Sequence, residues 1–105
     1  MTELSIIILN YNTPDLTINC LKSIVEASAS LGEVEVIVVD NGSGDDSCDQ
    51  IRESIKSITS TTSIIGKKSP TKFILIESKT NLGFAGGNNF GLKEATGKYI
   101  LFLNY

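Results

Sequence analysis

Residue types that can do chemistry gather at three points of the sequence, each on the C-terminal side of an apolar run. The first is NYN at residues 10–12, which sets amide donors and acceptors beside an aromatic ring. The second is DNGS at residues 40–43, whose carboxylate can accept a hydrogen bond from a ribose hydroxyl or a base N–H. The third is NLGFAGGNNFG at residues 81–91, where glycines allow backbone N–H groups to approach a phosphate. Together these groups have the chemistry needed to bind a nucleotide.

Each cluster by itself also has a plain structural explanation. NYN can connect a strand to a helix, and DNGS can cap a helix. The glycine-rich segment follows neither the Walker pattern nor the dinucleotide fingerprint, although a structural turn would not need its three asparagines. Asp45 and Asp46 could be offered as a base or as metal ligands, but we interpret them as first-turn residues of a helix.

Four apolar runs predict the strands that position these clusters. They cover residues 4–9, 34–39, 73–76 and 99–103, as expected for strands buried on both faces of a parallel sheet. Thr13 and Pro14 predict the start of a first helix, which Gly32 closes. The glycine-rich segment is expected to be a turn that feeds a short helix, with Gly97 at the C′ position. The Ser/Thr-rich segment 59–71 is the best candidate for a flexible loop.

The apolar spacing also predicts which helix faces are buried. The buried face of the first helix is expected to be Leu16, Cys20, Ile24 and Ala27, and that of the second Cys48, Ile51, Ile55 and Ile58. Both cysteines are therefore expected to act as small buried hydrophobic residues.

Strands that alternate with helices predict the fold class. We expect an α/β protein, a Rossmann-like three-layer α/β/α sandwich with a parallel sheet of order 3-2-1-4. The chain reverses direction across the sheet between strands 1 and 4, so a ligand crevice is expected at the carboxyl ends of these strands.

Composition excludes several classes of partner. The net charge is −3 and there is no run of Lys or Arg, which argues against nucleic acid and anionic membranes. The absence of histidine removes the commonest general base and the commonest zinc ligand. No apolar run is long enough to span a bilayer and no leader pattern is visible, so a cytoplasmic location is expected.

Three blocks carry a resemblance to a known family. SIIILNYN at the start, VIVVDNGSGDDS in the middle and NLGFAGGNNFGLKEATGKYILFLN at the end resemble glycosyltransferase family 2, in its rhamnosyltransferase-like branch. The resemblance covers nearly all of residues 1–105 and implies the N-terminal, nucleotide-sugar-binding half of a truncated GT-A domain, with an insert at about 59–71.

The resemblance also assigns roles to residues. It places the nucleotide sugar against Leu9, Asn10, Tyr11, Asn12, Asp40, Asn41, Asn81, Gly83, Gly86, Gly87 and Asn88. Asn104 would be the first position of a metal triad that binds Mg²⁺ or Mn²⁺ in the complete enzyme, although Tyr105 departs from the proline common at that place. The catalytic base would lie in the missing half, so the 105-residue chain is expected to be inactive by itself.

The implied reaction is inverting transfer of a sugar from a nucleoside diphosphate to an acceptor hydroxyl in polysaccharide or cell-surface glycan synthesis. The acceptor would be a glycan or a lipid-linked molecule, with the full-length enzyme at the inner membrane face. Strand 99–103 would lie at an unprotected sheet edge, so self-association through it is expected.

Two alternatives remain open from the sequence. One is a non-catalytic α/β module that binds a nucleotide. The other is a receiver-like or flavodoxin-like signalling domain, although a receiver needs an acidic pair after strand 1, where this chain has Asn10 and Asn12.

Overall fold

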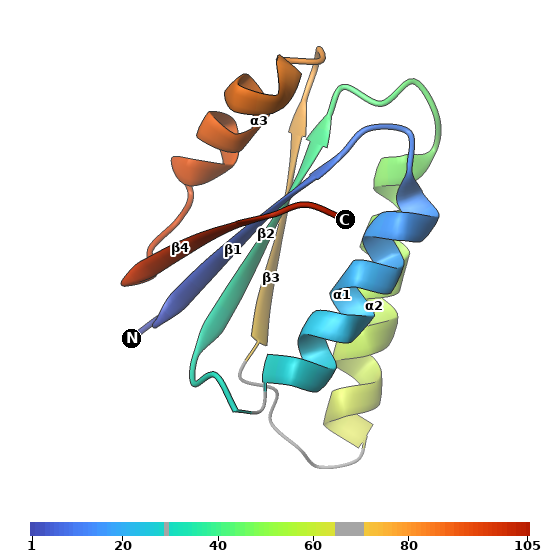
Figure 1. The fold of residues 1–105 in the computed structure, drawn as a ribbon. Helices are drawn as coiled ribbons and strands as arrows, with labels where there is room; N and C mark the ends of the chain where they lie inside the picture. Colours follow the sequence, from blue (N-terminus) through green and yellow to red (C-terminus); the bar gives the residue numbers. More distant parts are fainter. Residues whose placement is uncertain (29, 65–70) are drawn as a thin grey trace.

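The computed structural model of the chain describes residues 1–28, 30–64 and 71–105, with side chains at 61–64 excluded. Strands and helices alternate along it (Figure 1). The elements are β1 (Leu4–Asn10), α1 (Pro14–Ser28), β2 (Val34–Asn41), α2 (Ser47–Ile64), β3 (Thr71–Ser78), α3 (Gly83–Leu92) and β4 (Tyr99–Leu103).

The four strands form one parallel sheet in the order β3-β2-β1-β4, which confirms the predicted topology. Asn10 and Asp40 are register partners at the ends of β1 and β2, and Ile8 pairs with Leu103 near the end of β4. The polar segments that follow these strands therefore leave the sheet from the same edge.

Side chains alternate between the two faces of the sheet, and each face has its own core. The core under α1 and α2 contains Ile6, Ile8, Leu21, Ile24, Val34, Val36, Val38 and Ile51. The smaller core under α3 contains Ile7, Ile37 and Val39. Burying one such side chain contributes about 1.5–3 kcal/mol, so these strands stabilise both layers of helices. Figure 1 shows α1 and α2 together on one side of the sheet and α3 on the other.

The predicted buried face of α1 is confirmed at Ile24, and Cys20 packs partly buried against the same core, but the prediction is wrong by one residue at the start of the helix. Leu16 is 54% exposed, whereas Thr17 is fully buried. The reason is a polar contact, because Thr17 Oγ1 donates a hydrogen bond to Asn10 Oδ1 over 2.7 Å. A pattern of apolar spacing cannot place a buried threonine, so the prediction was wrong at this position.

The boundaries of α2 also differ from the prediction. The helix continues through residues 59–64, which the sequence analysis assigned to a loop, and β3 begins at Thr71. The rest of the predicted loop, residues 65–70, lies outside the described residues. Ile51 is buried as predicted, but Cys48 Sγ donates to Glu77 Oε1 over 2.8 Å instead of packing as a hydrophobic residue.

The glycine-rich segment is a helix from Gly83 onward, where a turn was predicted. Its glycines allow close packing on the sheet. A Cβ at Gly91 would lie 2.8 Å from Val39 Cγ2 and 2.9 Å from Ile7 Cγ2. Gly97 does not cap this helix, and its N–H donates to Ser5 Oγ over 2.8 Å. Among the described residues, no helix is long and apolar enough to cross a membrane.

Candidate nucleotide-sugar site

A pocket of about 370 Å³ opens at the carboxyl end of the sheet. It is lined by Leu9, Tyr11, Thr13, Asn41, Asn81, Gly83, Phe84, Leu103, Asn104 and Tyr105. These residues come from the ends of β1, β2 and β4 and from the start of α3. The pocket therefore lies where the strand order predicts a ligand crevice.

The structure brings six of the predicted site residues together around this pocket. They are Leu9, Tyr11, Asn41, Asn81, Gly83 and Asn104. The other six, Asn10, Asn12, Asp40, Gly86, Gly87 and Asn88, do not line it. Their positions are explained by hydrogen bonds and packing around the pocket.

Asn41 joins the end of β2 to the start of α3. Its Nδ2 donates to Asn81 Oδ1 over 3.2 Å and to Gly83 O over 3.1 Å, while its Oδ1 accepts from Leu82 N over 3.0 Å. Asn81 Oδ1 also accepts from Gly83 N over 2.8 Å. These bonds fix the first turn of α3 at the pocket wall.

Asp40 lies on the opposite face of the sheet from Asn41, because neighbouring residues of a strand alternate in direction. Its side chain is held by two donors: Asn10 Nδ2 donates to Asp40 Oδ1 over 3.1 Å, and Ser43 Oγ donates to the same atom over 2.5 Å. Asp40 is 6% exposed. Among the described residues nothing donates to Oδ2, so this oxygen is the free acceptor of the carboxylate.

Asn12 connects the two loops that follow β1 and β2. Its N–H donates to Ser43 Oγ over 3.0 Å, and its Oδ1 accepts from Gly44 N over 2.9 Å. Asn12 has a φ of 54°, a left-handed conformation that asparagine tolerates better than most residues. The predicted residue thus shapes the loop beside Asp40.

The inner residues of the glycine-rich helix act by packing. A Cβ at Gly87 would lie 2.9 Å from Asn41 Nδ2 and 3.0 Å from Leu9 Cδ2. A Cβ at Gly86 would lie 3.0 Å from Leu82 Cβ, and Asn88 is buried in the helix. Gly87 therefore allows α3 to approach Asn41 closely enough for the hydrogen bonds described above.

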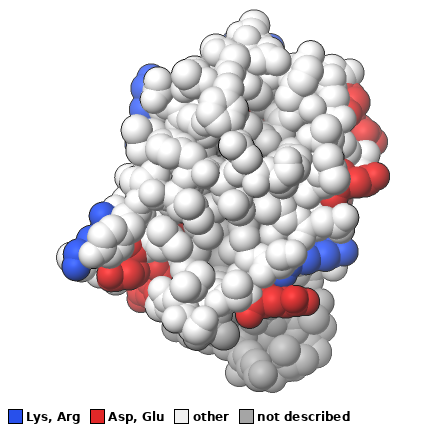
Figure 2. Space-filling view, viewed as in Figure 1, with Lys and Arg blue, Asp and Glu red and all other residues white. Residues whose placement is uncertain are grey.

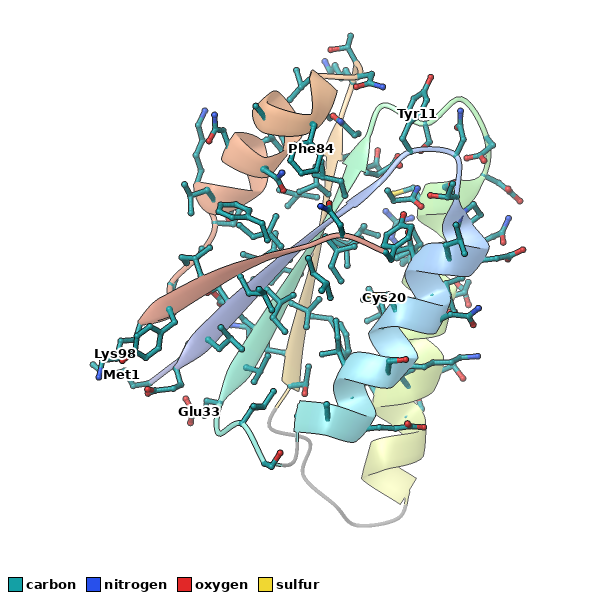
Figure 3. All side chains as sticks on the ribbon, in the orientation of Figure 1. Met1, Tyr11, Cys20, Glu33, Phe84 and Lys98 are labelled. Atoms are coloured by element: carbon teal, nitrogen blue, oxygen red, sulfur yellow. The ribbon has the colours of Figure 1, made fainter. Side chains whose placement is uncertain are left out.

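Four pocket residues were missing from the predicted set: Thr13, Phe84, Leu103 and Tyr105. Phe84 is 61% exposed and lies at the same end of the sheet as Tyr11 (Figure 3). The position of Phe84 next to Gly83, inside the glycine-rich segment, was a sequence signal that could have identified it. Tyr105 had no such signal, because its role depends on contacts with β1 and α1.

The pocket offers few groups that suit a divalent cation. Hard cations prefer carboxylate oxygens, and the lining donors are neutral amide, hydroxyl and backbone groups. No group of three or more His, Cys, Asp or Glu that could hold a metal occurs in the part of the chain that the structure describes. Asn104 provides one amide oxygen, so the lining residues do not make up a metal site by themselves.

The surface around the pocket is also largely uncharged. On the face shown in Figure 2, Lys, Arg, Asp and Glu lie toward the margin, and the region between α3 and α1 carries none of them at its centre. The pocket therefore offers a ligand hydrogen-bonding groups, aromatic surface and a helix N-terminus, and no charged side chain in its lining.

The family model for glycosyl transferase family 2 matches residues 5–104. Because this match covers nearly the whole chain, the protein belongs to glycosyl transferase family 2. Membership of this family excludes the alternative that the chain is a receiver-like or flavodoxin-like signalling domain.

Two curated relatives are similar over almost the whole chain. The poly(ribitol-phosphate) beta-glucosyltransferase of Bacillus spizizenii is 33% identical over 103 residues, which is 97% of this chain and 14% of the relative. The UDP-Glc:alpha-D-GlcNAc-diphosphoundecaprenol beta-1,3-glucosyltransferase of Escherichia coli is 33% identical over 104 residues, which is 99% of this chain and 35% of the relative. The chain thus spans a minor part of the length of both.

Solved glycosyltransferases share the fold. A mannosyltransferase from Pyrobaculum calidifontis, in complex with GDP-Man and Mn²⁺, has a TM-score of 0.73 and 22% identity, over 93% of this chain and 26% of that one. S. aureus TarS 1-349, in complex with UDP-GlcNAc, has a TM-score of 0.57 and 23% identity, over 97% of this chain and 26% of that one. These similarities confirm the GT-A class of fold.

Proposed function

We propose that the chain is the nucleotide-sugar-binding part of a glycosyltransferase that transfers a sugar from a nucleoside diphosphate to an acceptor hydroxyl. The observation that carries this proposal is the pocket at the carboxyl edge, where Tyr11, Asn81 and Asn104 meet beside the Asp40 network. Family membership supports glycosyl transfer as the reaction class.

The base and ribose would bind beside Asp40 and Tyr11. Oδ2 of Asp40 can accept a hydrogen bond from a base N–H or a ribose hydroxyl, and its orientation is fixed by Asn10 and Ser43. Tyr11 is exposed and offers a flat ring on which a base can stack. Leu9 would contribute apolar contact below the ring.

The diphosphate and the donor sugar would lie at the start of α3. Asn41 and Asn81 accept from the N–H groups of Leu82 and Gly83, and Leu82 at the N-cap makes no side-chain capping bond, so the N–H groups that follow Gly83 in the first turn remain for an anion. The helix dipole favours negative charge there, and no acidic side chain lines the pocket. Phe84 and Asn81 would contact the sugar.

The remaining features of the reaction come from family resemblance and from relatives. Inversion at the anomeric carbon and a rhamnosyl-type or other hexosyl donor remain proposals. Both curated relatives are named as glucosyltransferases, one for a poly(ribitol-phosphate) and one for a diphosphoundecaprenol-linked sugar. These names support a glycan or lipid-linked acceptor, and an acceptor with a long lipid would place the enzyme at the inner membrane face.

Catalysis would need groups beyond the pocket residues. Asn104 would supply one oxygen to Mg²⁺ or Mn²⁺, a cation that in this class stabilises the leaving diphosphate. We propose that the 105-residue chain binds the donor but does not transfer the sugar, because no carboxylate lines the pocket to serve as a base.

We also propose that β4 mediates self-association. Its edge carries exposed Tyr99, Ile100, Leu101 and Phe102. Within the described residues, β4 pairs only with β1, so its outer N–H and C=O groups are available to a second copy. The uncharged centre of the face in Figure 2, which β4 crosses, supports this contact.

Calorimetric titration with UDP and GDP tests the proposed binding. Asp40→Asn should weaken binding by about 10- to 100-fold, because a hydrogen bond to a charged group contributes about 1.5–3 kcal/mol. Asp15→Asn is the matched control, since Asp15 is exposed in the first turn of α1. Equal affinities of the Asp40 variant and the unmodified chain would contradict the assignment.

A further inference from the structure

The phenol hydroxyl of Tyr105 lies where β4, β1 and α1 meet. Its oxygen is 2.8 Å from Thr13 Oγ1, 2.6 Å from Thr17 Oγ1 and 3.0 Å from Leu9 O. Three contacts from one hydroxyl hold the residue that follows Asn104 against the opposite wall of the pocket. None of the proposed contacts with the nucleotide sugar involves this hydroxyl.

These contacts continue to the carboxylate of Asp40, which we propose binds the base or ribose of the nucleotide. Thr17 Oγ1 donates to Asn10 Oδ1 over 2.7 Å, and Asn10 Nδ2 donates to Asp40 Oδ1 over 3.1 Å. Both Thr17 and Asn10 are fully buried, so water does not compete for these bonds. A continuous series of side chains therefore connects Tyr105 to Asp40.

The number of protons that each group carries limits the direction of these hydrogen bonds. Each hydroxyl has one proton to donate, and Asn10 Oδ1 can only accept, so Thr17 donates its proton to Asn10. The phenol has a single proton, and two acceptors lie within its reach, Thr17 Oγ1 at 2.6 Å and the carbonyl oxygen of Leu9 at 3.0 Å. Thr13 Oγ1 lies 2.8 Å from the phenol oxygen and 3.5 Å from Asn10 Oδ1, to which it can also donate. When the phenol donates to Thr17, the donors point toward Asp40, and hydrogen bonds aligned in this way strengthen one another.

We propose that Tyr105 is a positioning residue that couples the Asn104 side of the pocket to Asp40. This inference rests on the proposed nucleotide site. The phenol fixes the position of the segment carrying Asn104, and the same hydroxyl, through Thr17 and Asn10, helps to orient the carboxylate that accepts from the base or ribose. A nucleotide that contacts both Asn104 and Asp40 then meets side chains that are already oriented by this series of contacts.

The first experiment needs no ligand. NMR of the free chain would compare the side-chain amide resonances of Asn10 in Tyr105→Phe with those in the unmodified protein. Tyr105→Phe keeps the ring but removes the hydroxyl, and it should shift these resonances. Tyr99→Phe is the matched control, because Tyr99 lies exposed at the start of β4 and outside this series of contacts, and it should not shift these resonances.

A second pair of variants keeps the test decisive if Tyr105→Phe folds poorly. Thr17→Val removes the middle hydroxyl and should shift the Asn10 resonances, whereas Thr17→Ser retains a hydroxyl and should restore them. Unchanged Asn10 resonances in both Tyr105→Phe and Thr17→Val would overturn the connection. Rescue by serine would show that the Thr17 hydroxyl, and not the volume of its side chain, carries the connection.

The second experiment measures UDP affinity. Tyr105→Phe should weaken UDP binding about three- to tenfold, the effect of a neutral hydrogen bond, while Tyr99→Phe leaves it unchanged. In a protein that already carries Asp40→Asn, Tyr105→Phe should not weaken UDP binding any further, because the two residues act through one network. Fully additive effects would overturn the coupling. Failure of the unmodified chain to bind UDP or GDP would instead refute the proposed function, and the NMR comparison would still decide the structural connection.

Discussion

The Asn10 side-chain amide donates a hydrogen bond to Asp40 Oδ1 over 3.1 Å, between two residues that are register partners on parallel strands. Asn10 is fully buried, and its Oδ1 accepts from Thr17. The asparagine therefore supports the carboxylate from inside the fold, at the edge where the proposed ligand would bind.

Replacing Asn10 with alanine should destabilise the protein as well as loosen the site. The change removes the hydrogen bonds that Asn10 makes with Thr17 and Asp40 inside the fold, which costs about 1–3 kcal/mol in the free energy of unfolding. Urea denaturation of Asn10→Ala and of Asn19→Ala, an exposed asparagine on α1, would measure this cost. Equal midpoints for the two variants would show that the Asn10 network does not stabilise the fold.

Acid stability should depend on Glu35, which is 2% exposed. Burial by itself raises the pKa of Glu35, but hydrogen bonds from Ser5 and Thr96 outweigh it and hold the pKa below its ordinary value. Because the folded pKa is depressed, the ionised carboxylate stabilises the fold above the unfolded pKa of about 4.3, and this contribution is lost as the pH falls through the lower folded pKa.

Glu35→Gln should therefore lower the unfolding free energy at pH 7 and flatten its decline below about pH 4.5. Glu26→Gln, at an exposed position on α1, is the control and should retain the decline of the unmodified chain. Thermal unfolding between pH 3 and pH 7 would compare the three proteins. An unchanged slope in Glu35→Gln would rule out Glu35 as the source of the acid sensitivity.

The packing of α3 on the sheet should not tolerate a methyl group at Gly91. A Cβ there would meet Val39 and Ile7 at less than 3 Å, and overpacking a core costs about 1–3 kcal/mol. Gly44→Ala is the matched control, because a Cβ at Gly44 meets nothing within 4 Å. Chemical denaturation should show a loss of stability for Gly91→Ala alone, and similar stabilities for both variants would contradict the close approach of α3.

Self-association through β4 should be weakened by a charge at Leu101, which is 43% exposed on this strand. Leu101→Lys places an ammonium group in the proposed contact, as charged residues do on protected sheet edges. Leu16→Lys makes the same change at an exposed leucine on α1. Light scattering across a dilution series should show dimers for the unmodified chain and for Leu16→Lys, and monomers for Leu101→Lys. A monomeric unmodified chain at high micromolar concentration would refute this contact.

The sheet could be predicted from sequence because its strands are continuous apolar runs. Such runs are typical of strands covered on both faces, and the intervening helices restrict the connections to a few parallel topologies. The burial of Thr17 at the start of α1 could not be predicted, because it depends on the hydrogen bond to Asn10. The helical state of the glycine-rich segment was also missed, since its stability comes from close packing on the sheet.

Site residues could be predicted from the sequence where they lie in segments that follow a strand. Asn41 and Asn81 were identified because they lie in polar segments that follow apolar runs, and because the family resemblance places the nucleotide sugar against these segments. The separation of Asp40 from the pocket follows from strand alternation across β2, which needs the exact strand register. Tyr105 could not be identified, since its three contacts come from residues 88 to 96 positions earlier in the chain.

An NMR titration of the 105-residue chain with UDP tests the central claim most directly, because it shows where the nucleotide binds. We predict that UDP shifts the resonances of Tyr11, Asp40, Asn81 and Asn104 at the carboxyl edge of the sheet, and that these shifts saturate together. Shifts confined to the groove between α1 and α2, around Asp49 and Glu53, or the absence of any saturable shift, would contradict it.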